Sequence, residues 1–180
     1  MLLSMQLVGG YGSEPGAWRL PGVDLNSHTD MDAYVRFARS AERGKIQLLF
    51  FADTPVLDAD LARQPLRYVL DPIVVMTAIA RETARIGLVA TGSTTFTEPF
   101  NLARQYKALD VISHGRVGWD AVTPSSPDAA ANFGAAVPPR HQKYERAHEV
   151  VHIVESLGGS WQRDAFVGDV DRGVFADPTR

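Results

Sequence analysis

Residues 46–53 read Ile-Gln-Leu-Leu-Phe-Phe-Ala-Asp, a nearly unbroken apolar run that ends on a carboxylate. A strand that is apolar on both faces is typical of a parallel sheet whose two faces are both covered. Three other apolar runs of strand length occur, at residues 2–8, 86–90 and 117–122. The sequence therefore predicts a parallel sheet, with Asp53 at the carboxyl end of one of its strands.

A helical pattern follows each of these runs. The predicted helices cover residues 31–43, 72–84, 99–113 and a segment around 144–157, whereas residues 123–139 and the tail from 158 are expected to be loops without a hairpin. Alternation of strands and helices is the signature of parallel βα units. Four such units fit either a small doubly wound sheet or half of a (β/α)₈ barrel. In both architectures, ligands bind at the carboxyl ends of the strands.

Composition excludes several classes of function. The chain has 180 residues, a formal net charge of −3 and no cysteine. Thiolate nucleophiles, disulfides and cysteine-bound metals are therefore excluded, and there is no basic excess to bind nucleic acid. No apolar run approaches the roughly 20 residues that a membrane helix needs, and the N-terminus does not resemble a signal peptide. We expect a cytoplasmic protein without nucleic-acid or membrane partners.

The predicted strand ends carry the candidate site residues. Asp53 could accept hydrogen bonds from a polar ligand, or could simply cap the following turn. The stretch Thr91-Gly92-Ser93-Thr94-Thr95 offers hydroxyls and a glycine within five residues. Such a stretch can cradle an anion or a polar ring, but it can equally form an ordinary Ser/Thr turn. Residues 120–126 follow the fourth predicted strand and complete this edge.

A metal-site pattern occurs in the last predicted helix. His148-Glu149-Val150-Val151-His152 matches the HExxH motif of zinc proteases. That motif needs a third ligand downstream, and no histidine follows His152. We therefore expect no metal site.

Several stretches together resemble a known family and occur in the family's order. They are Ala41-Glu42-Arg43-Gly44-Lys45, Phe50-Phe51-Ala52-Asp53, Ile86-Gly87-Leu88-Val89-Ala90-Thr91-Gly92-Ser93-Thr94-Thr95, Glu98-Pro99-Phe100, Gly115-Arg116-Val117-Gly118-Trp119 and Ala131-Asn132-Phe133-Gly134. The chain resembles the bacterial luciferase-like flavin-dependent monooxygenases, in the branch of nitrilotriacetate monooxygenase, pristinamycin synthase A and dibenzothiophene-sulfone monooxygenase. The resemblance covers essentially the whole chain.

The resemblance implies a TIM-type (β/α)₈ barrel, of which this chain supplies about the first four βα units. It also implies an enzyme that uses reduced FMN and O₂ to oxygenate a small organic substrate, with a separate NAD(P)H:FMN reductase as partner. Position by position, Asp53 and Thr91 match flavin-contacting residues of the family. His141 and Tyr144 match a flavin-binding His/Tyr pair, at a spacing one residue shorter than usual. No residue is assigned as catalytic, and a homo-oligomer is left open.

The chain departs from the family pattern in three places. Asp120 follows Gly118-Trp119 where the family commonly has asparagine, and the loop between Asp53 and Asp71 is shorter than the family's. Residues 1–180 match the N-terminal part of one family domain, with residues 160–180 starting an insertion before the fifth strand. Three alternatives stay open: an inactive truncated fragment, a fragment that only binds flavin, and a deazaflavin (F420)-dependent reductase of the same superfamily.

Overall fold

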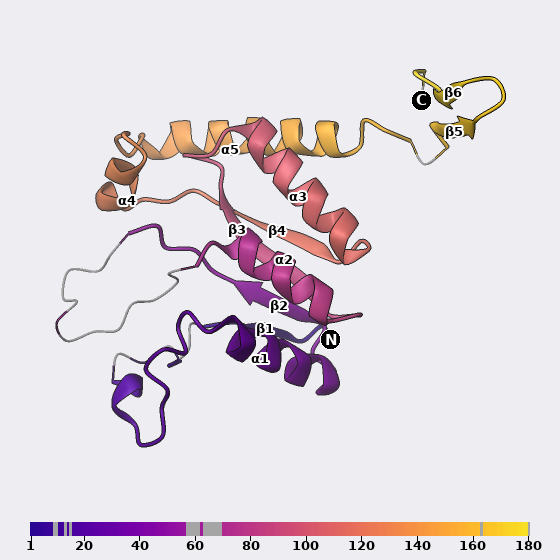
Figure 1. The fold of residues 1–180 in the computed structure, drawn as a ribbon. Helices are drawn as coiled ribbons and strands as arrows, with labels where there is room; N and C mark the ends of the chain where they lie inside the picture. The colour runs from indigo at the N-terminus through magenta and orange to yellow at the C-terminus, as the bar shows by residue number, and fades with distance from the viewer. Residues whose placement is uncertain are drawn as a thin grey trace.

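Four parallel strands form a single sheet in the order of the chain (Figure 1). They are β1 (Ser4–Gln6), β2 (Leu48–Phe51), β3 (Gly87–Ser93) and β4 (Val117–Val122). The structure is a computed structural model and describes residues 1–8, 11–12, 14, 16–56, 62, 70–162 and 164–179. Most of the loop between Asp53 and Asp71, which is predicted from the sequence to be shorter than the family's, lies outside these residues.

Helices follow the strands as the sequence predicts. After the short η1 (Ala17–Arg19) come α1 (Met31–Arg43), α2 (Pro72–Glu82), α3 (Pro99–Ser113) and α5 (Arg140–Gly158). Their starts are fixed by local chemistry. The Asp30 side chain accepts a hydrogen bond from the Asp32 backbone N–H and begins α1. Prolines occupy the first turns of α2 and α3, where a missing N–H costs nothing.

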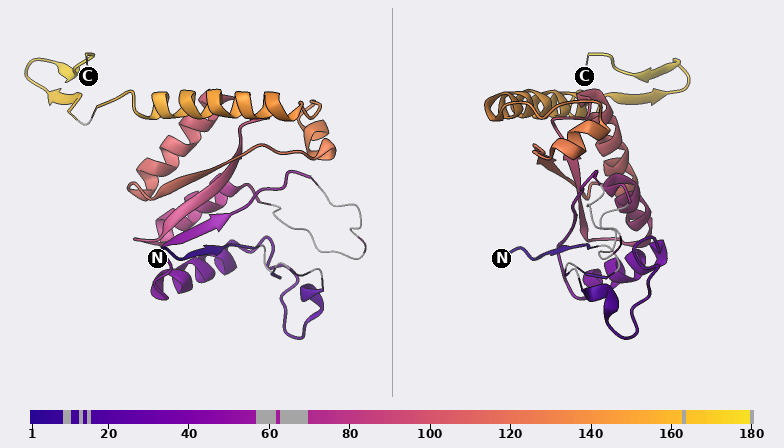
Figure 2. Two further views of the ribbon diagram at one scale, coloured as in Figure 1. Left: turned by 180° about the vertical axis from the view of Figure 1, so that it is seen from behind. Right: turned by 90° about the vertical axis from the view of Figure 1, so that its left-hand side faces the viewer.

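The first three long helices cover one face of the sheet, as the right-hand view of Figure 2 shows. Alternate strand residues point into that layer, so Leu49, Phe51 and Leu88 are fully buried. Phe50 and Val89, which are paired in register on the other face, are only half-buried. The main core therefore lies between the sheet and α1, α2 and α3, and the opposite face of the sheet is less covered.

Three elements occur where the sequence predicted only loop. Helix α4 (Pro127–Asn132) begins because the Ser126 hydroxyl accepts a hydrogen bond from the Ala129 N–H and proline follows at the first turn. In the tail, β5 (Phe166–Asp169) and β6 (Val174–Ala176) form an antiparallel hairpin, whose Phe166 and Phe175 rings pack 5.1 Å apart. The prediction of a tail without a hairpin was wrong, because these strands are too short for an alternating pattern to be visible.

The C-terminal hairpin stands apart from the rest of the chain, beyond the end of α5 (Figures 1 and 2). Helix α5 itself packs against α3 and touches β4. Among the helices in the described part of the chain, none is both long and apolar enough to cross a membrane.

Candidate functional site

A cavity of about 190 Å³ lies at the carboxyl ends of the strands. It is lined by Asp53, Pro55, Asp71, Ile73, Thr91, Gly92, Ser93, Thr97, Leu102, Gln105, Val122, Pro124 and Phe133. Asp53 comes after β2, Thr91 to Ser93 end β3, and Val122 ends β4. The structure thus brings Asp53 and Thr91 into one cavity, at the edge of the sheet where parallel βα folds bind ligands.

Two carboxylates give this cavity its charge. Asp71 caps α2, where one of its oxygens accepts hydrogen bonds from the Ile73 and Val74 N–H groups at 2.9 and 3.0 Å. Burial raises the pKa of Asp53, and the negative charge of Asp71 raises it further, while a hydrogen bond from the Thr54 backbone acts in the opposite direction. No lysine or arginine is among the described residues that line the cavity. The wall is therefore acidic and rich in hydrogen-bond acceptors.

The β3 side of the cavity is held by hydrogen bonds to residues that do not line the cavity themselves. The Thr91 hydroxyl donates to the Asp120 carboxylate at 2.9 Å, across the β3–β4 register. The Trp119 indole donates to the Gly92 carbonyl at 3.1 Å, and the Tyr106 hydroxyl donates to the Ala90 carbonyl at 2.7 Å. These bonds fix the backbone of β3 just where it meets the cavity.

Tyr106 is one of the residues that hold the backbone of β3 at the cavity, and its side chain is uncharged. Burial raises the pKa of its hydroxyl far above the usual range, and the nearby carboxylates of Asp120, Asp71 and Asp53 raise it further. The hydroxyl is therefore a permanent hydrogen-bond donor to the Ala90 carbonyl.

The hydroxyl stretch of the sequence is divided between the cavity and a turn. Thr91, Gly92 and Ser93 line the cavity. The Ser93 hydroxyl oxygen also accepts from the Thr95 and Phe96 N–H groups, both at 3.1 Å, as in an ordinary Ser/Thr turn. Thr94 is fully buried and donates to the Val122 carbonyl. The interpretation as a Ser/Thr turn is therefore confirmed at Ser93, and the interpretation as a cradle for a ligand stays a prediction.

The predicted pair on α5 lies outside the cavity. His141 and Tyr144 are exposed in the first turns of the helix, and neither is among the described residues that line the cavity. The Tyr144 ring instead lies beneath the Arg140 guanidinium, 5.7 Å from ring centre to carbon. Their role in binding a ligand stays a prediction.

Two cations that sequence reasoning missed attach α5 to the rim of the cavity. Lys143 is buried and its ammonium donates to the Pro124 carbonyl at 3.2 Å and to the Ser125 hydroxyl. Arg146 donates to the Thr94 carbonyl at 3.0 Å. The signal for Lys143 is that it is one of only three lysines in the chain and lies between the two predicted site residues of α5. Asp71, at the N-cap of α2, and Gln105, in the middle of α3, were also missed as lining residues, because the sequence does not show which residues of a helix face a cavity.

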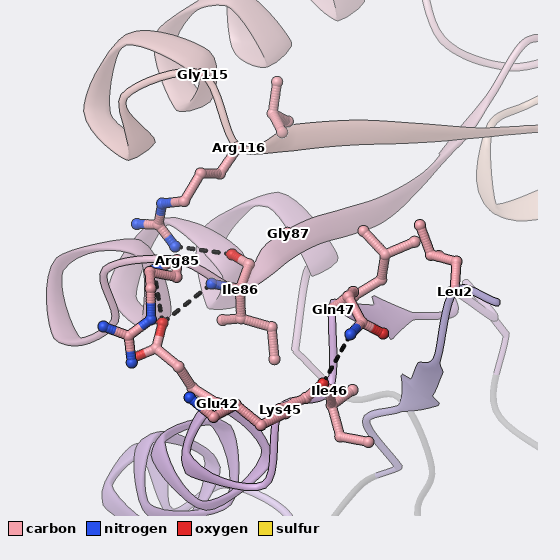
Figure 3. Close-up of a pocket in the computed structure, with 12 residues that line it drawn as sticks. Leu2, Glu42, Lys45, Ile46, Gln47, Arg85, Ile86, Gly87, Gly115 and Arg116 are labelled. Atoms are coloured by element: carbon pink, nitrogen blue, oxygen red, sulfur yellow. Dashed lines mark hydrogen bonds between the residues drawn. The ribbon is translucent and has the colours of Figure 1, made fainter.

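A larger pocket of about 580 Å³ lies at the opposite, amino ends of the strands (Figure 3). Two of its charged groups, those of Glu42 and Arg116, are bonded within the protein. One oxygen of Glu42 accepts from the backbone N–H groups of Ala84, Arg85 and Ile86. Burial raises the pKa of Glu42, but these three bonds and the charge of Arg85 outweigh it and leave the pKa lowered.

Arg116 is the second polar anchor of this pocket, and all of its donors are in use. Its five N–H groups bond to Ser113 O, Thr83 Oγ1, Ile86 O, Ala80 O and Thr83 O. The Arg116–Ile86 bond is drawn in Figure 3. Arg116 and Glu42 therefore join loops and helix ends, and the cavity at the carboxyl ends of the strands is the candidate site.

The HExxH pattern falls on an exposed part of α5. His148, Glu149 and His152 are all exposed. In the described part of the chain, no group of three or more histidine, aspartate or glutamate side chains is arranged to hold a metal ion. The residues that match the HExxH motif therefore lie on an ordinary surface helix.

Comparison with known proteins identifies the family to which this fold belongs. The sequence profile described as luciferase-like monooxygenase matches residues 13–170. N-acetyl-S-(2-succino)cysteine monooxygenase of Bacillus subtilis (strain 168) is 40% identical over 169 residues, which are 93% of this chain and 38% of that protein. Nitrilotriacetate monooxygenase component A of Aminobacter aminovorans is 36% identical over an alignment of 177 residues that covers 91% of this chain and 39% of that protein.

Solved structures give the same result. EDTA monooxygenase from Chelativorans sp. BNC1 superimposes with a TM-score of 0.86 at 36% identity, over 99% of this chain and 42% of the other. Riboflavin lyase, solved with modified FMN and riboflavin, superimposes with a TM-score of 0.84 at 29% identity, over 98% of this chain and 41% of the other.

The chain belongs to the luciferase-like monooxygenase family. Its relatives include nitrilotriacetate monooxygenase, as the sequence motifs predict. Its four strands and their helices correspond to the first βα units of a TIM-type barrel, which confirms the predicted fold class. The chain spans about two fifths of the length of the relatives it matches.

Proposed function

We propose that this chain supplies the flavin-ring side of the active site of an FMNH₂- and O₂-dependent monooxygenase. The observation that carries the proposal is the convergence of Asp53 from β2 and Thr91 from β3 on one cavity at the carboxyl ends of the strands. The family of monooxygenases to which the chain belongs, and an FMN-containing neighbour, support the choice of cofactor.

The residues of the cavity fit a flavin ring. Its acceptors, chiefly Asp53 and Thr91, suit the N–H groups along the polar edge of the ring. Apolar side chains such as Leu102, Val122 and Phe133 suit the flat aromatic body. The acidic wall does not suit the phosphate of FMN, so we place only the ring here. His141 and Tyr144 are proposed as further contacts from α5.

When bound, reduced flavin supplies the electrons that activate O₂, and the protein's part is to position the ring and exclude water. Asp53 would hold the polar edge of the ring through a hydrogen bond. Pro124 and Phe133 would shield one side of the cavity from solvent, with Lys143 fixing the loop that carries Pro124.

The finer details of function are part of the same proposal. The substrate is a small organic molecule. The reduced flavin is supplied by a separate NAD(P)H:FMN reductase, which places the reaction in the cytoplasm, where NAD(P)H is made.

Anaerobic titration of the full chain with reduced FMN, oxidised FMN and reduced F420 tests the proposal. We expect reduced FMN to bind, and the Asp53→Asn variant to bind it about tenfold more weakly, because a hydrogen bond to a charged carboxylate is replaced by a weaker one to a neutral amide. Oxygen uptake with a flavin reductase then tests catalysis. Binding of F420 in preference to FMN favours the reductase alternative. Binding without oxygen uptake favours a fragment that only binds flavin, and a folded chain that binds neither cofactor contradicts the proposal.

A further inference from the structure

Asp120 lies behind the candidate site rather than in it. It is the cross-strand neighbour of Thr91 in the β3–β4 register, and its carboxylate accepts the Thr91 hydroxyl at 2.9 Å. Thr91 lines the cavity, whereas Asp120 is not among the described residues that line it. Any effect of Asp120 through this bond therefore reaches a ligand by way of Thr91.

This bond fixes the direction in which the Thr91 hydroxyl can interact. An ionised carboxylate can only accept hydrogen bonds, whereas a hydroxyl has one proton to donate and two lone pairs to accept with. Because Thr91 gives its proton to Asp120, only its lone pairs remain for the cavity. Thr91 is 6% exposed, so water competes little for this oxygen.

The rest of the cavity strengthens this bias. Asp53 and Asp71 add two carboxylates to the wall, and the described lining residues include no lysine or arginine. A ligand that presents N–H groups is favoured here. A ligand that presents lone pairs toward Thr91 or the two carboxylates meets other lone pairs there and is disfavoured, because a buried polar group left unpaired is costly.

The oxidation state of a flavin changes this property of its ring. Oxidised flavin has bare nitrogens at positions 1 and 5, which accept hydrogen bonds. Two-electron reduction with protonation makes these positions N–H donors. We propose that Asp120 is a positioning residue that makes Thr91 an obligatory acceptor, so that the cavity selects reduced over oxidised flavin. This inference rests on the proposed function, because it takes the ligand to be a flavin.

The test measures the affinity of the full chain for reduced and for oxidised FMN, by anaerobic calorimetry, in matched variants. We expect Asp120→Asn to lower the ratio of the two affinities about tenfold, the value of one hydrogen bond, because an amide can donate to Thr91 and release its proton. For a two-electron couple, this corresponds to a change of about 30 mV in the midpoint potential of bound FMN. Thr91→Ser should keep the ratio, and Thr91→Val should lower it as Asp120→Asn does.

The double variant Thr91→Val/Asp120→Asn separates this role from a direct effect of the Asp120 charge. If Asp120 acts only through Thr91, the double variant has the same ratio as Thr91→Val alone. The surface variant Asp171→Asn, at an exposed position of the C-terminal hairpin, is the control for loss of a carboxylate and should keep the ratio. Circular dichroism confirms that each variant is folded.

Three outcomes decide between the two proposals. A ratio unchanged in Asp120→Asn overturns the inference alone. A further fall in the double variant beyond Thr91→Val also overturns it, because Asp120 then acts on the flavin directly. A folded chain that binds neither form of FMN overturns the proposed function, and the inference falls with it.

Discussion

Gly92 lies where β3 meets the cavity, and the residues behind it leave no room for a side chain. A Cβ atom at this position would lie 2.8 Å from both the Trp119 Nε1 and the Tyr106 hydroxyl, each of which is already hydrogen-bonded to the β3 backbone. We therefore expect Gly92→Ala to destabilise the protein by about 1–3 kcal/mol, as is usual for overpacking. Urea unfolding measures this change.

The control for this substitution is Gly158→Ala at the end of α5, where a Cβ would meet nothing within 4 Å. It should be neutral or stabilising by up to about 1 kcal/mol, because alanine favours helix. Equal free energies of unfolding for the two variants would contradict the prediction, because the structure would then accommodate a Cβ atom at position 92 without loss of stability.

Asp53 should make the stability of the protein depend on pH in an unusual direction. Its raised pKa means that the folded chain holds this proton more tightly than the unfolded chain. The contribution is fully present below the unfolded value, near 3.8, and is lost as the pH rises through the folded-state pKa. We therefore expect the Asp53→Asn variant to lose less stability than the wild type when the pH is raised from 3.8. At pH 7 the variant should be at least as stable as the wild type.

Denaturant unfolding of both proteins from pH 3.5 to 7 measures this difference. A site residue that stabilises the fold would give the opposite sign, with Asp53→Asn less stable at neutral pH. Combined with weaker binding of reduced FMN, greater stability of Asp53→Asn would be the expected signature of a residue kept for ligand binding.

At the scale of secondary-structure elements, Arg116 connects the ends of three of them. It donates to Ala80 and Thr83 at the end of α2, to Ser113 at the end of α3 and to Ile86 just before β3. Lysine has only three donors on one nitrogen and cannot reproduce this pattern. We expect Arg116→Lys to cost about 2–4 kcal/mol in thermal or urea unfolding.

Arg81→Lys is the matched control, because Arg81 is an exposed residue in the last turn of α2. It should change stability by less than about 0.5 kcal/mol. A similar cost for both substitutions would mean that the hydrogen bonds of Arg116 contribute little net stability.

The order of strands and helices was predictable because it depends on local pattern. Apolar runs and capping residues such as Asp71 identify βα units without any knowledge of tertiary contacts. The short elements α4 and the β5–β6 hairpin were missed because they extend over too few residues for a period to be visible.

The site was predictable only in part, for a related reason. Asp53 and Thr91 could be placed together because parallel strands share one edge. Asp71 and Gln105 reach the cavity from helices, and their positions depend on how those helices pack. Asp120 could be named as a departure from the family, but its bond to Thr91 depends on the register of β3 and β4, which the sequence does not specify.

At the scale of the whole molecule, β4 is an edge strand of the sheet in the part of the chain that the structure describes. In the described part of the chain, β1 pairs only with β2, and β4 pairs only with β3. Unpaired edges with exposed backbone groups promote association between chains. We expect the 180-residue chain to self-associate with rising concentration, and Ala121→Lys, on the exposed edge of β4, to weaken this association at least tenfold.

Sedimentation velocity over a range of concentrations measures this association. Gln142→Lys, which adds the same charge on the exposed surface of α5, is the control and should leave it unchanged. Equal weakening by both substitutions would indicate general charge repulsion instead of edge pairing.

The position of Trp119 has a practical consequence. The chain has three tryptophans: Trp18 in η1, Trp119 in β4 and Trp161 between α5 and the hairpin. Among the described residues, Trp119 is the tryptophan that is bonded to the wall of the cavity, through the Gly92 carbonyl. Its emission therefore reports optically on this site. A flavin bound in the cavity would quench it by energy transfer, so a protein with phenylalanine at positions 18 and 161 carries its own fluorescent binding sensor.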